Sequence, residues 1–111
     1  MCGIFGYVGK NNNAAQLVFE GLKLLEYRGY DSWGIAAKEN KKFIVEKHVG
    51  KIGSATLKSS IINHKSLPAG RQGQMAIGHT RWATHGGVTV KNAHPHLNCT
   101  KTIAVVHNVI V

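Results

Sequence analysis

Cys2 is the residue of this sequence with the most direct chemistry. Removal of Met1, which is expected when a small side chain follows it, leaves a cysteine whose α-amino group lies beside its own thiol. An α-amino group titrates near about 7.7 to 8.0 and a thiol near about 8.5, so the amine can accept the thiol proton close to neutral pH, directly or through water. This pattern predicts a nucleophile for acyl transfer that needs no histidine base. The alternative is an unreactive, buried small residue.

A second group of functional side chains lies in residues 78–86, directly after a segment predicted as a strand. Arg81 offers a planar guanidinium that suits a carboxylate, and Trp82 offers an apolar wall. Thr84 and His85 add short polar contacts. Each of these residues alone is compatible with an ordinary surface or core position. Four of them within five positions predict a loop that binds a small molecule.

Asn108 lies toward the end of the last predicted strand, and its side-chain amide can stabilise an oxyanion. One such donor contributes about 3 to 4 kcal/mol to the stabilisation of the transition state.

A metal site is an alternative hypothesis for this histidine-rich chain, and its candidate ligands are His85, His94, His96, His107 and Cys99. The sequence has no Cys-x-x-Cys or His-Glu-x-x-His unit, so we expect hydrogen-bonding histidines and no metal.

The elements that must position these residues follow from hydrophobic periodicity. Apolar residues recur at helical spacing over residues 14–26, after a run of asparagines suited to capping. Apolar, β-favouring runs predict strands, the first of which would hold the chain start in a sheet. A short helix and an exposed loop are predicted as well. The predicted strands are 3–9, 33–38, 43–49, 75–79 and 103–111, with a hairpin joining the second and third, a short helix at 56–63 and a loop at 66–73.

Composition limits the classes of protein to which the chain can belong. Its 111 residues are 43% hydrophobic and 17% charged, which suits one small globular unit. No apolar run approaches the ~20 residues of a membrane span, and no secretory signal is present, so a cytoplasmic, membrane-free protein with two free thiols is expected. The net charge of +9 raises a nucleic-acid-binding alternative. Its basic residues are scattered and carry no binding signature, so we predict no nucleic-acid partner.

Several of these segments together resemble the class II glutamine amidotransferase domain of the glutamine–fructose-6-phosphate aminotransferases (isomerizing), the glucosamine-6-phosphate synthases. A Cys-Gly-Ile start alone also fits amidophosphoribosyltransferase and asparagine synthetase. The second and third of the matching segments are typical of the glucosamine-6-phosphate synthase branch. The segments are 1–6 (MCGIFG), 25–32 (LEYRGYDS), 78–86 (GHTRWATHG), 92–96 (NAHPH) and 107–108 (HN).

The resemblance implies an α+β fold of the N-terminal nucleophile hydrolase type, incomplete here, with two antiparallel sheets between helical layers. Residues 1–111 would be the N-terminal part of the amidotransferase domain, without the sugar-phosphate isomerase domain. Cys2 would attack the side-chain amide of glutamine, with its α-amine as base, to give a thioester and ammonia. In the family this ammonia aminates fructose 6-phosphate to glucosamine 6-phosphate. No cofactor is implied, and full-length relatives would be homodimers.

By the same resemblance Arg81 binds the α-carboxylate of glutamine, and Asn108 supplies an oxyanion-hole donor. The pocket would be shaped by Trp82, Thr84 and His85. Three features depart from the family pattern. The family has glycine where this chain has Val109, whose β-branched side chain disfavours φ > 0 and can crowd the substrate. The second is that the sequence ends before the family's acidic residue that holds the glutamine α-amino group. The third is Trp33 in place of a small residue, together with an apparent insertion at 67–74.

These departures keep two alternatives open at the level of the sequence. One is an inactive or partner-dependent fragment of such an enzyme, since the last predicted strand is still apolar at Val111. The other is a different class II amidotransferase, such as amidophosphoribosyltransferase.

Overall fold

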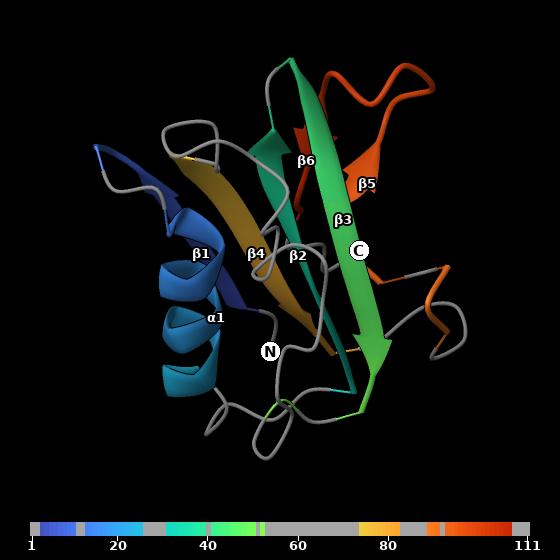
Figure 1. Cartoon of the computed structure of the whole chain (residues 1–111). Coiled ribbons are helices and arrows are strands. Elements are labelled where there is room, and N and C mark those ends of the chain that lie inside the picture. The colour runs from blue at the N-terminus through green and yellow to red at the C-terminus, as the bar shows by residue number, and fades with distance from the viewer. Residues whose placement is uncertain are drawn as a thin grey trace.

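The computed structural model describes residues 3–10, 13–25, 31–39, 41–50, 52, 74–82, 89–91 and 93–107. Six strands and one helix lie in this part of the chain (Figure 1). Their bounds are β1 (Gly3–Val8), α1 (Ala14–Leu24), β2 (Ser32–Glu39), β3 (Lys42–Val49), β4 (Met75–Arg81), β5 (His96–Leu97) and β6 (Ala104–Val105).

Four strands form one antiparallel sheet in the order β1-β4-β2-β3. The predicted β2–β3 hairpin is confirmed, with Ser32 paired with Val49 and Glu39 with Lys42. The chain start is held in the sheet as expected, because β1 pairs with β4 along its whole length, from Gly3 opposite Thr80 to Val8 opposite Met75. β4 and β2 therefore each lie between two hydrogen-bonded neighbours, in the centre of the sheet.

The helix α1 covers one face of this sheet and was predicted from its apolar periodicity. Val18, Phe19 and Leu22 are buried on the side that meets the sheet, while Glu20 and Lys23 are exposed. This amphipathic spacing, rather than a strong cap, accounts for the helix. Asn13 occupies the N-cap position, but its side chain makes no capping hydrogen bond, so the predicted capping role of the asparagines is wrong for this residue.

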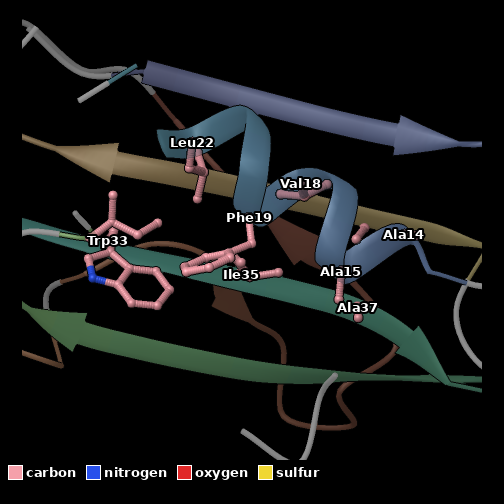
Figure 2. Packing of buried hydrophobic residues seen from close by; sticks show 10 residues of the cluster. Ala14, Ala15, Val18, Phe19, Leu22, Trp33, Ile35 and Ala37 are labelled. Atoms are coloured by element: carbon pink, nitrogen blue, oxygen red, sulfur yellow. The ribbon is translucent and has the colours of Figure 1, made fainter. Parts of the chain in front are cut away.

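The core lies between α1 and the sheet (Figure 2). Successive strand residues point to opposite faces, and the odd-numbered residues of β2 face the helix: Trp33, Ile35 and Ala37 are all buried in this cluster. Two glycines let the layers approach closely. A Cβ on Gly78 would lie 2.5 Å from Val18 Cγ1, and one on Gly21 would lie 2.5 Å from the Phe5 ring.

The second sheet, β5–β6, belongs to a segment that covers the other face of β2. A Cβ on Gly34 would point away from the helix and overlap the carbonyl oxygen of His94, so this position requires glycine. The loop between β5 and β6 is organised by Asn98, whose Oδ1 accepts hydrogen bonds from the backbone N–H groups of Thr102 (2.8 Å) and Ile103 (2.9 Å). The layers are thus helix, four-stranded sheet and two-stranded sheet.

This arrangement confirms the α+β class with two antiparallel sheets, and the part of the chain described above contains one helical layer. The strand predicted over 103–111 is much shorter within this part, because only Ala104 and Val105 pair, with Leu97 and His96. The strand β5 was not predicted. The predictions for residues 56–63 and 66–73 lie outside the described residues. No helix among the described residues is long and apolar enough to cross a bilayer.

Candidate functional site

The predicted binding loop begins inside a strand. β4 continues to Arg81, so Thr80 and Arg81, which the sequence placed after a strand that ended at His79, are held by the sheet and not by a loop. The cause is pairing on both sides, since β1 reaches Thr80 and β2 reaches Arg81. Trp82 follows directly and is 48% exposed, which leaves its ring accessible as the predicted apolar wall.

Thr80 connects this strand end to the start of the chain. Its Oγ1 accepts a buried hydrogen bond of 3.1 Å from the backbone N–H of Gly3, and Thr80 is 1% exposed. A Cβ on Gly3 would lie 2.8 Å from that oxygen, so glycine allows the contact. The residue that follows Cys2 is therefore fixed to the residue that precedes Arg81.

The backbone of Arg81 is also fixed from the side of β2. The N–H of Asp31 donates to the Arg81 carbonyl at 2.9 Å, and the N–H of Gly50 donates to the Asp31 carbonyl at 2.8 Å. Arg81 is half-buried and lies two residues after His79 in the strand, so both side chains belong to the face opposite α1. A guanidinium held by a central strand suits precise carboxylate recognition.

Three imidazole rings pack in a row on this same face: the His79 and His94 rings are stacked, and the His94 and His96 rings meet edge to face. The His79 and His94 ring centroids are 4.3 Å apart at 30°, and those of His94 and His96 are 4.5 Å apart at 60°. The described residues contain no group of three or more His, Cys, Asp or Glu side chains arranged to hold a metal ion. The geometry is that of stacked rings, and Cys99 is a free, exposed thiol.

His79 makes the hydrogen bond that defines this stack. Its Nε2 lies 3.0 Å from the backbone oxygen of His107. A carbonyl oxygen only accepts, so Nε2 carries the proton and Nδ1 does not. Nδ1 of His79 and Nδ1 of His94 are buried and have no partner among the residues that the structure describes. The neutral ring satisfies this environment better than a cation, which would bury a second N–H donor.

The electrostatic surroundings act in the same direction. Burial, and then the neighbouring charge of His94, lower the pKa of His79 from 6.5 to about 4, against the raising effect of the His107 hydrogen bond. Burial, and then His96, Arg81 and Lys47, lower the pKa of His94 to about 4. Burial, Lys47 and Arg81 also lower the pKa of His96. The stack is neutral at physiological pH, and Arg81 and Lys47 supply the positive charge beside it.

This stack makes the stability of the fold depend on pH. Folding depresses the pKa of His79 and His94 from 6.5 to about 4, so their contribution is complete above pH 6.5 and is lost as the pH falls through this interval. We expect the urea midpoint of the purified protein to be constant above about pH 7 and to fall steadily between about pH 6.5 and 5, where carboxyl groups scarcely titrate. His94→Gln should flatten the profile. A flat profile in the unaltered protein would contradict the assignment.

The structure thus describes two of the six predicted site residues, Arg81 and Trp82, and places them in sequence at the end of β4. Two residues that support the site were not singled out in the sequence, His79 and Thr80. A polar pair at the end of an otherwise apolar strand was the available signal. The other four predicted site residues lie outside the described residues: Cys2, Thr84, His85 and Asn108.

Comparisons with known proteins were made by sequence and by structure. No family model matches the sequence. The whole chain aligns with glutamine–fructose-6-phosphate aminotransferases (isomerizing) from Clostridium perfringens at 49% identity, Chlamydia muridarum at 51% and Pyrococcus horikoshii at 50%. It spans 17% of the length of each of these relatives.

Two solved structures share the fold. The allosteric regulatory enzyme of purine biosynthesis matches over 87% of this chain and 19% of its own, with a TM-score of 0.61 and 31% identity. The glutamine phosphoribosylpyrophosphate amidotransferase from B. subtilis matches over 88% of this chain and 19% of its own, with a TM-score of 0.60 and 28% identity. The fold is that of the N-terminal nucleophile amidotransferases. Over its whole length the chain is thus a relative of the glutamine–fructose-6-phosphate aminotransferases in sequence, and of the glutamine amidotransferases in structure.

Proposed function

We propose that this chain provides the glutamine-hydrolysing site of an enzyme that aminates fructose 6-phosphate to glucosamine 6-phosphate. Residues 1–111 are then the N-terminal part of its amidotransferase domain. The sugar-phosphate reaction belongs to a part of such enzymes that these residues do not cover. The identity of 49 to 51% with the aminotransferases, against 28 to 31% with the two solved structures, favours this acceptor over a phosphoribosyl acceptor.

The observation that carries the proposal is the hydrogen bond between Gly3 N and Thr80 Oγ1, 3.1 Å long and buried. Cys2 is bonded to Gly3, and Arg81 is bonded to Thr80, so each of the two functional residues is the direct sequence neighbour of one partner in this contact. Consecutive Cα atoms are about 3.8 Å apart, which keeps the nucleophile and the carboxylate-binding guanidinium at the same end of β4. This proximity along the chain supports a site that one glutamine spans.

The proposed reaction starts with transfer of the Cys2 thiol proton to the α-amine of the same residue. The thiolate adds to the side-chain amide carbon of glutamine, and Asn108 donates a hydrogen bond to the oxyanion. The carbon–nitrogen bond then breaks, and the α-ammonium returns the proton to the departing nitrogen, which leaves as ammonia. Water hydrolyses the thioester to glutamate and restores the thiol.

The other residues orient the substrate. Arg81 binds the α-carboxylate in the ground state and the transition state alike, while the half-exposed Trp82 ring limits the pocket. Thr84 and His85 complete the polar contacts of that pocket. The neutral histidine stack beside Arg81 leaves the guanidinium as the dominant charge for the carboxylate.

The test is glutamine hydrolysis by the purified full chain. We expect ammonia and glutamate in equal amounts, and an electrophilic glutamine analogue that labels one thiol per chain and is excluded by glutamine. Peptide mapping should place the label on the N-terminal cysteine. A protein with its N-terminal cysteine exposed, as intact mass would report, that neither releases ammonia nor takes the label would refute the proposal and favour an inactive or partner-dependent fragment.

A further inference from the structure

His79 is the one fully buried ionisable side chain on β4, and the reaction proposed above does not use it. Its side chain is 0% exposed, and its strand is paired on both sides, with Ile4 of β1 and Gly34 of β2 opposite it. Burying a polar ring in a central strand is costly unless the ring makes a specific interaction. The interaction it makes is the hydrogen bond to His107.

That hydrogen bond acts on the peptide unit that joins His107 to Asn108. The carbonyl oxygen at 3.0 Å from His79 Nε2 belongs to the same planar amide as the backbone nitrogen of Asn108. Fixing this oxygen therefore fixes the plane from which Asn108 begins. His107 itself is exposed and lies beyond the last pair of β6, so sheet pairing does not hold this peptide within the described residues.

The donor is rigid. The strand fixes the His79 backbone, and the His94 ring stacked at 4.3 Å restricts the rotation of its imidazole. His94 is in turn anchored where its carbonyl oxygen packs against Gly34 of β2. Oxyanion donors work because they are held in place before the reaction, and a displacement of about 1 Å can cost about 100-fold in rate.

We propose that His79 is a positioning residue that holds the His107–Asn108 peptide by its Nε2–H bond and so aims the Asn108 amide at the oxyanion. This inference rests on the proposed glutaminase function. Two adjacent residues of β4 then position the reacting groups. Thr80 accepts a hydrogen bond from the backbone of Gly3, next to the nucleophile, and His79 donates one to the backbone of His107, next to the oxyanion donor.

The experiment measures glutamine hydrolysis by the purified full chain, with rates divided by the number of thiols that react with the electrophilic glutamine analogue. His79→Leu removes the donor, and we expect kcat to fall about 10- to 100-fold while KM for glutamine changes less than about 3-fold. His79→Gln places an amide N–H at the same number of bonds from the backbone as Nε2, so it should recover most of the loss. His48→Gln, at an exposed histidine of β3 that packs on Trp33 and not on the stack, should keep the unaltered kcat.

A double-mutant cycle with Asn108→Ala separates positioning from general support. Asn108→Ala alone should lower kcat by about 100- to 1000-fold. If His79 acts through Asn108, adding His79→Leu to this variant should lower kcat less than about 3-fold further. If the losses in kcat of His79→Leu and Asn108→Ala multiply in the double variant, or if His79→Leu changes only KM, the inference is overturned and the glutaminase function stands. An unaltered chain that releases no ammonia would instead refute the proposed function itself.

Discussion

Replacing Cys2 with alanine should abolish glutamine hydrolysis, lowering kcat by at least about 10⁴-fold, the scale seen when a covalent nucleophile is removed. The variant keeps the α-amine, so the loss isolates the thiol. Glutamine binding should persist, because the carboxylate contact is made by Arg81 and not by the nucleophile. The measurements are ammonia release and the dissociation constant for glutamine, obtained by calorimetry on the same preparation.

Cys99 provides the matched control for this experiment. It is the only other cysteine of the chain, and it is free and exposed on the loop between β5 and β6. Cys99→Ala should leave ammonia release and thiol labelling by the glutamine analogue unchanged. Equal losses in the two variants would indicate a general effect of thiol removal, and residual hydrolysis near the unaltered rate in Cys2→Ala would exclude thioester chemistry at this residue.

The elements of the sheet and helix could be predicted because each has a strong local signal. Val18 and Leu22 recur at the helical period, and the β2 segment alternates Trp33, Ile35 and Ala37 toward one side. The family resemblance then supplied the chemistry, and the comparisons confirm that lineage. Periodicity identifies a strand but does not indicate which other strand it pairs with, so it could not predict the order β1-β4-β2-β3.

The parts that could not be predicted depend on contacts between distant segments. β4 extends to Arg81 because Asp31 and β2 pair with it, although the local sequence there is polar. The β6 segment is apolar over several residues, yet only two pair among the described residues, because β5 is equally short. The sequence predicted hydrogen-bonding histidines at 94 and 96, and the packing of their rings appears only when His79 is placed beside them.

Arg81→Leu should raise KM for glutamine by about 100-fold or more while kcat changes little. Losing a charge-assisted contact to a bound ion costs about 2 to 5 kcal/mol, and the α-carboxylate bears the same charge in the ground state and the transition state. The loss is therefore one of uniform binding, which appears in KM. Arg81→Lys should recover only part of it, since an ammonium cannot form the two parallel hydrogen bonds of a guanidinium.

A change of substrate makes this prediction specific to the carboxylate. The unaltered protein should prefer glutamine strongly over its α-amide, which lacks the negative charge, whereas Arg81→Leu should hydrolyse the two at similar kcat/KM. Lys47→Met is the matched control, because Lys47 is the neighbouring cation on the same sheet face and lowers the pKa of His94 as Arg81 does. If Lys47→Met raised KM as much as Arg81→Leu, the net charge of this face would govern binding. If Arg81→Leu kept its preference for glutamine over the α-amide, the carboxylate would have to be bound elsewhere.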